Sequence, residues 1–159
     1  MSASTSSAGS GLAGLAPFVL RVVVGVIMFA HGLMKLQNGP AGFGKNLAEL
    51  GVPAPALMGY VVTFTELVGG ILLVIGLLSR LAALALTIDL VVAVFLVKIN
   101  VGLIAPRGGG AGAELDLALI AAFLAILLAG PGRLSLDGLV GIDRGDWAPR
   151  APGAGPPAT

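Results

Sequence analysis

Two carboxylates lie in the middle of long apolar stretches, where ionisable side chains are costly. Glu66 is the eleventh residue, and the one charged residue, of the 23-residue stretch from Ala56 to Leu78. Asp89 is the ninth residue of the stretch from Leu81 to Val97. A charge at the centre of a membrane costs at least ~2.5 kcal/mol, so such a residue faces protein, water or a ligand. We expect both acids to face a bundle interior, and Arg21 to form a structural ion pair with Asp89 or Glu66.

Two further ionisable side chains lie near the end of the first apolar stretch. His31 and Lys35 are four residues apart, so on a helix they share one face. Histidine exchanges protons near neutral pH, and a carboxyl group accepts or donates a hydrogen bond according to its protonation state. We therefore assign catalytic roles to His31 and Glu66, and a ligand contact to Lys35. The structural alternatives are a hydrogen bond from His31 to a nearby carbonyl and a snorkelling Lys35.

Three more residues are predicted to contact a ligand. Gly69 and Gly70 follow Glu66 by three and four positions, so they share its helical face and admit a flat ligand or another backbone closely. Close helix packing is the alternative role for both glycines. Asp116 lies one turn inside a later apolar stretch, where it serves either a ligand or the helix N-terminus.

The composition is that of a membrane protein. Of 159 residues, 57% are hydrophobic and 11% are charged, whereas soluble domains carry about 25% charged residues. The mean hydropathy is +1.02. The chain has no cysteine and one histidine, which excludes thiol chemistry, thiolate metal sites and an intramolecular bis-histidine haem. We predict no covalent cofactor and no metal site. A net charge of +1 without a basic cluster predicts no nucleic-acid binding.

The elements that position these residues are four apolar helices. The hydropathy pattern predicts membrane spans at Leu15–Leu36, Ala56–Leu78, Leu81–Val97 and Glu114–Ala129. Short connections such as Leu78-Ser79-Arg80 place neighbouring helices antiparallel. The predicted fold is therefore all-α, an integral membrane antiparallel four-helix bundle over residues 15–141. Residues 1–14 and 142–159 are predicted to be flexible or disordered tails. Short helices are expected at Phe43–Leu50 and from a Ser135 cap to Gly141.

Four spans place both termini on one side of the membrane. The cations on that side are Arg21, Arg80, Arg133, Arg144 and Arg150, and those on the other are Lys35, Lys45, Lys98 and Arg107. The excess favours cytoplasmic termini. Counting depth along each span then places a polar pocket of His31, Lys35, Glu66 and Asp116 in the non-cytoplasmic half of the bundle.

Several short motifs together resemble the DoxX family of small four-helix membrane proteins. The similarity covers about Leu15 to Gly138, and its order and spacing are more specific than any single motif. The matching stretches are Arg21-Val-Val-Val-Gly25, Ala30-His31-Gly32-Leu-Met-Lys35-Leu36, Gly51-Val-Pro53-Ala-Pro55, Glu66-Leu-Val-Gly69-Gly70, Gly76-Leu-Leu-Ser-Arg80 and Gly130-Pro-Gly-Arg133-Leu-Ser-Leu-Asp137. Lys98-Ile-Asn100 is a departure, because many relatives are expected to carry a histidine there.

The resemblance implies a bacterial inner-membrane protein linked to quinone-dependent sulfur oxidation or to oxidative-stress complexes. It implies quinone as the cofactor, and soluble redox enzymes or a second oxidoreductase subunit as partners. The composition adds the lipid bilayer as a partner, and the sequence leaves open whether the chain forms a homo-oligomer. An apolar cleft with a few hydrogen-bonding groups suits a quinone head group. Two alternatives stay open: a membrane scaffold without its own catalysis, and a transporter of protons or small molecules.

Overall fold

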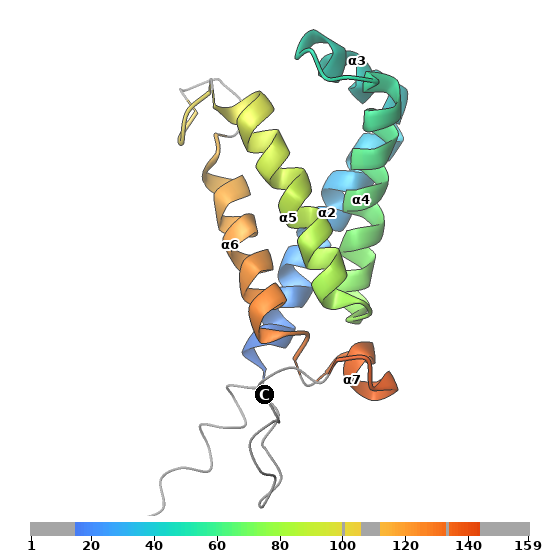
Figure 1. Cartoon of the computed structure of the whole chain (residues 1–159), viewed down its shortest axis with the longest axis vertical. Helices are drawn as coiled ribbons and strands as arrows, with labels where there is room; N and C mark the ends of the chain where they lie inside the picture. Colours follow the sequence, from blue (N-terminus) through green and yellow to red (C-terminus); the bar gives the residue numbers. More distant parts are fainter. Residues whose placement is uncertain (1–14, 100, 106–111, 133, 144–159) are drawn as a thin grey trace, which may run out of the picture.

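The described part of the protein, in a computed structural model, is built from helices and their connections (Figure 1). It comprises residues 15–99, 101–105, 112–132 and 134–143. The elements are α2 (Ala16–Asn38), α3 (Pro40–Glu49), α4 (Pro55–Ile75), α5 (Ser79–Ala93), the π-helical turn η1 (Val94–Lys98), α6 (Glu114–Ala129) and α7 (Leu136–Val140). The predicted all-α membrane fold is confirmed. The predicted tails lie outside the described residues, except for Ile142 and Asp143.

Three helices have the length and hydropathy to cross a membrane. They are α2 with 23 residues, α4 with 21, and α5 continued by η1 over the 20 residues Ser79–Lys98. At about 1.5 Å per residue, each reaches roughly 30 Å, the thickness of a hydrocarbon core. Helix α6 has the predicted bounds, but its 16 residues reach about 24 Å. That α6 forms a fourth span stays a prediction.

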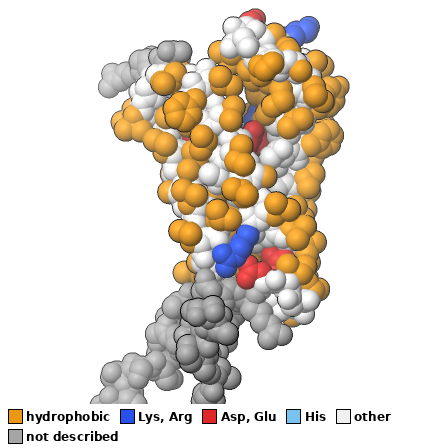
Figure 2. All heavy atoms as spheres, in the orientation of Figure 1, with side chains coloured by type: hydrophobic (Ala, Val, Ile, Leu, Met, Phe, Trp, Pro, Cys, Tyr) orange, Lys and Arg blue, Asp and Glu red, His pale blue; other side chains and the backbone are white. Residues whose placement is uncertain are grey.

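The helices pack around a small apolar core and expose apolar side chains on the outside. Val24, Met28, Leu73, Leu86, Phe123 and Ile126 form the centre of the core, where α2, α4, α5 and α6 meet. Figure 2 shows hydrophobic side chains covering most of the outer surface of the bundle. A surface of this kind is stable in lipid and not in water, so the bilayer is the partner that the fold itself requires.

Helices α2 and α4 approach one another through glycines. A Cβ atom added at Gly70 would lie 2.7 Å from the carbonyl oxygen of Gly25, and one added at Gly32 would lie 2.7 Å from Cα of Leu67. Real side chains essentially never approach so closely. The two backbones are therefore in contact, which is the packing that small residues allow between helices in membranes.

Arg21 links the start of α2 to the end of α4 and to the segment after α6 by hydrogen bonds. Its guanidinium is fully buried and donates from Nε to the carbonyl of Pro131 (3.2 Å) and from its terminal nitrogens to Val74 (3.0 Å) and Leu134 (2.6 Å). A further bond reaches the carbonyl of Leu73. These acceptors include carbonyls near the C-terminal end of α4, which have no partner within the helix.

The predicted ion pair between Arg21 and Asp89 is wrong. Arg21 donates four hydrogen bonds to backbone oxygens, whereas Lys35 pairs with Glu66 and Arg80 with Asp143. A guanidinium has five N–H donors in a fixed fork, so a corner rich in free carbonyls satisfies it as well as a carboxylate does.

Candidate functional site

A cavity of about 220 Å³ opens between the helices at the end away from Arg21. Its twelve lining residues come from α2, α3, α4, α5, η1 and α6, and seven of them are apolar. They are Met28, His31, Lys35, Phe43, Glu66, Leu90, Ala93, Val97, Lys98, Leu115, Asp116 and Leu119. On the face drawn in Figure 2, acidic and basic atoms are recessed between hydrophobic side chains in the upper half of the bundle. The structure thus brings together the four residues predicted for the pocket.

A buried ion pair forms one wall of the cavity. Nζ of Lys35 lies 2.5 Å from Oε2 of Glu66, and their side chains are 16% and 4% exposed. The same ammonium group lies 5.1 Å from the centre of the Phe43 ring, in cation–π contact. The ion pair gives Glu66 its partner in the membrane, and it places the charge of Lys35 inside the cavity instead of at the lipid headgroups.

His31 lines the cavity, and one of its ring nitrogens is bonded to the backbone of its own helix. Its Nδ1 lies 3.0 Å from the carbonyl oxygen of Ile27, one turn earlier in α2. A carbonyl oxygen only accepts, so Nδ1 carries the proton and Nε2 of the neutral ring carries a lone pair. The hydrogen bond to a nearby carbonyl, which was the structural alternative for His31, is therefore made by Nδ1. Nε2 remains able to accept a hydrogen bond or a proton.

Two more acids, Asp116 and Asp89, interact with the charged groups of the site. Asp116 lines the cavity, and its Oδ2 is buried without a hydrogen-bond partner. The ammonium group of Lys98 acts electrostatically on Asp116. Asp89 does not line the cavity, but it is half-buried and interacts electrostatically with Glu66 and Lys35. Two acids and two lysines therefore line a largely apolar space, and Asp89 interacts with Glu66 and Lys35 from outside that lining.

Comparison with known proteins places the chain in a family. The DoxX family model matches residues 16–99, which contain His31, Lys35, Glu66 and Asp89. The chain belongs to the DoxX family. The resemblance of its motifs to that family is thereby confirmed.

Curated relatives of this DoxX protein cover most of its length. The Bacillus subtilis protein named "Putative oxidoreductase CatD" is 35% identical over 122 residues, which are 77% of this chain and 84% of the relative. The Mycobacterium tuberculosis protein named "Uncharacterized membrane protein Rv3486" is 33% identical over 129 residues, 74% of this chain and 77% of the relative. No solved structure matches the chain.

Gly69 and Gly70 do not line the cavity of this DoxX protein. Gly70 packs against the backbone of α2 at Gly25 and Phe29, and a Cβ at Gly69 would lie 3.1 Å from Cγ of Leu86 in α5. The predicted ligand contact of the two glycines is thus replaced by the alternative, close helix packing. Glycines at a helix interface need no ligand to explain them.

Phe43 and Lys98 are among the lining residues that were not predicted as site residues. Phe43 reaches the cavity because α3 packs on α4 at Gly44 and Gly59, where an added Cβ at Gly59 would lie 3.0 Å from the amide nitrogen of Gly44. Lys98 reaches it because η1 turns the end of α5. The paired glycines were a signal for the first contact. Membrane depth already placed Lys98 in the same half of the bundle as the predicted pocket, but a single π-helical turn leaves no periodicity that shows which way its side chain is turned.

Proposed function

We propose that this membrane protein is a quinone-interacting subunit of a membrane-associated oxidoreductase or oxidative-stress complex. The observation that carries the proposal is the cavity: an apolar space in the bundle with His31, Lys35, Glu66 and Asp116 at its wall. Lipophilic ligands with a few polar atoms bind in clefts of this kind. The name of the Bacillus subtilis relative, which contains the word oxidoreductase, points in the same direction.

The chain's own residues suit the two polar ends of a quinone head group. Lys35 has ammonium protons to donate to an oxygen atom, and the His31 ring can serve as a donor or an acceptor of a proton. When bound, the quinone supplies the electron acceptor or donor. The chain contains no cysteine, so we propose that electrons are exchanged with a soluble redox enzyme or a second oxidoreductase subunit.

The test is quinone-dependent turnover by membranes that contain the assembled complex. We expect His31→Ala to lower turnover by about 10²-fold, because it removes a group that transfers protons. Glu66→Gln should lower it as well, although the amide oxygen still accepts from Lys35 and preserves abundance. Met34→Ala, at an α2 side chain that is 52% exposed, serves as the control. Normal turnover in both site variants would remove quinone chemistry from this cavity and favour a scaffold role.

A second candidate function is the movement of protons across the membrane. Lys35, Glu66 and Asp89 place interacting charges inside a membrane-spanning body, and such groups form proton relays in transporters. Purified protein in liposomes with a pH-sensitive dye inside separates the two. Proton uptake that is lost in Glu66→Gln, together with unchanged quinone turnover, would favour transport.

A further inference from the structure

The polar groups in the cavity can be sorted by whether they donate or accept. The donors are the ammonium groups of Lys35 and Lys98. Lys35 already donates to Glu66 over 2.5 Å and lies against Phe43, and Lys98 interacts with Asp116. Both donors are therefore partly engaged by the cavity's own acids.

The acceptors in the cavity are less well satisfied. Nδ1 of His31 is the donor to Ile27, so Nε2 of a neutral ring is an acceptor, and it makes no hydrogen bond within the described residues. Oδ2 of Asp116 is buried without a partner. A buried acceptor without a donor lowers stability, and a ligand that brings the missing donor recovers that loss.

The charge balance points to the same kind of ligand. The two acids that line the cavity, Glu66 and Asp116, equal in number the two lysines, Lys35 and Lys98, so the lining has no excess of positive charge to attract an anion. A neutral hydroxyl group would donate to an acceptor without disturbing this balance. Phe43 and the apolar lining residues suit the ring to which such a hydroxyl group is attached.

We propose that the cavity binds its ligand preferentially as a hydroquinone, with one hydroxyl group donating to Nε2 of His31. The inference rests on the proposed function and deepens it. The oxygens of a quinone only accept, so the quinone leaves Nε2 of His31 without a donor. The hydroxyl oxygens of a hydroquinone both donate and accept, and can satisfy His31 and Lys35 together.

Binding of three ligands of one shape tests the hydrogen-bond direction. The full chain in lipid nanodiscs is titrated without oxygen against a short-chain 1,4-benzoquinone, its hydroquinone, and the 1,4-dimethoxy analogue, which lacks the donors. We expect the hydroquinone to bind about tenfold more tightly than the other two. In His31→Ala this advantage should shrink to about threefold or less, while Met34→Ala should retain it.

The outcomes separate this inference from the proposed function. Equal affinities, or tighter binding of the quinone, overturn the hydroquinone preference and leave a quinone site in place. A tenfold advantage that survives in His31→Ala overturns the role of Nε2. If none of the three ligands binds to the wild-type protein, the proposed function fails and this inference fails with it. The comparison with the dimethoxy analogue uses the wild-type chain alone, so it does not depend on the folding of a variant.

Discussion

Lys35 and Glu66 form an ion pair in a place that bulk water hardly reaches, with side chains 16% and 4% exposed. A buried ion pair contributes little net stability compared with a well-packed apolar pair, but breaking it by removing one partner leaves a charge without compensation. The net contribution of the intact pair to stability is therefore small, although the loss of either partner alone is costly.

A double-mutant cycle at Lys35 and Glu66 follows from this argument. We expect Glu66→Leu and Lys35→Met each to lower the free energy of unfolding by about 3 kcal/mol, because each leaves the other charge buried. The double variant should be destabilised by less than the sum of the two, with a coupling of at least about 1 kcal/mol. Denaturant unfolding in a mild detergent measures all four proteins. Additive effects would contradict a buried, coupled pair.

A second prediction for a single residue concerns Arg21. We expect Arg21→Met to lower the free energy of unfolding by about 3 kcal/mol, because carbonyls of Leu73, Val74, Pro131 and Leu134 lose their donor. Arg21→Lys keeps the charge but not the planar fork, so its effect should be intermediate. Thermal unfolding followed by circular dichroism compares the three. If Arg21→Lys matched the wild type, charge and not the geometry of the fork would explain this corner.

At the scale of the elements, the close contact of α2 and α4 depends on glycines. We predict that Gly70→Ala destabilises the bundle by about 1–3 kcal/mol, because the new Cβ atom would meet the backbone of α2. Gly42→Ala is the matched control, since an added Cβ there meets no atom within 4 Å. The same unfolding measurement applies, and an unchanged Gly70→Ala protein would refute backbone contact between the two helices.

The sequence predicted those elements whose signals are local. Helix α6 has the predicted bounds Glu114–Ala129, and Ser135 caps α7 by accepting from the amide of Gly138 over 3.1 Å. Hydropathy and capping residues act within a few positions, so a single chain reveals them. The start of α3 at Pro40 instead of Phe43 is an error of three residues in a polar, glycine-rich connector.

The sequence predicted the site in part, because its polar residues could be placed by depth. His31, Lys35, Glu66 and Asp116 meet as expected, since membrane depth limits where costly groups can lie. The partner of Arg21 was mispredicted because depth does not reveal free backbone carbonyls. Gly69 and Gly70 were assigned to a ligand because spacing alone does not reveal which neighbour fills a helix face.

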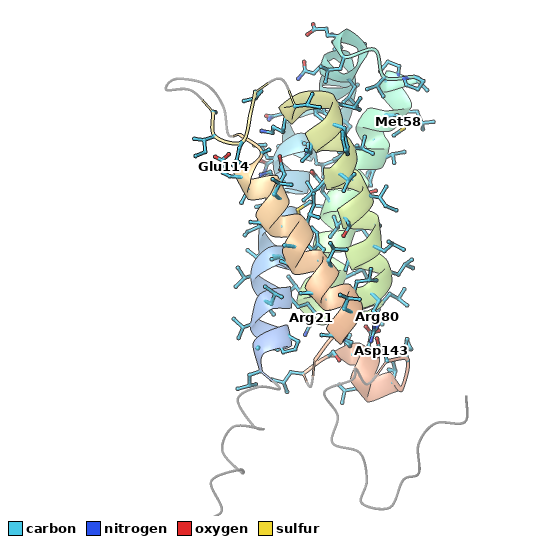
Figure 3. The ribbon with its side chains drawn as sticks, turned by 60° about the vertical axis from the view of Figure 1, so that its left-hand side comes forward. Arg21, Met58, Arg80, Glu114 and Asp143 are labelled. Carbon is cyan, nitrogen blue, oxygen red and sulfur yellow. The ribbon has the colours of Figure 1, made fainter. Side chains whose placement is uncertain are left out.

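At the scale of the whole molecule, the two ends of the bundle differ. Figure 3 shows Arg21, Arg80 and Asp143 near one end, and Met58 and Glu114 toward the other. The first end contains the hydrogen bonds from Arg21 to backbone carbonyls and the Arg80–Asp143 salt bridge. The cavity lies toward the second end, with His31 and Lys35 from the later half of α2. The cavity and the bonds of Arg21 and Arg80 therefore lie at opposite ends of the bundle.

The last prediction concerns orientation, and it also decides whether α6 crosses the membrane. Helix α6 begins beside η1, where Ala113 and Glu114 donate to the carbonyls of Gly102 and Leu103, and it ends beside Arg21. It therefore runs the length of α5 in the opposite direction, which favours a fourth span despite its 16 residues. We expect a fluorescent reporter fused after Thr159 to be active in the cytoplasm, and a periplasm-dependent phosphatase inserted at Gly109 to be active outside. A C-terminal phosphatase active outside would refute cytoplasmic termini. Signals from the same side at both positions would show that α6 returns without crossing, leaving a bundle with three spans.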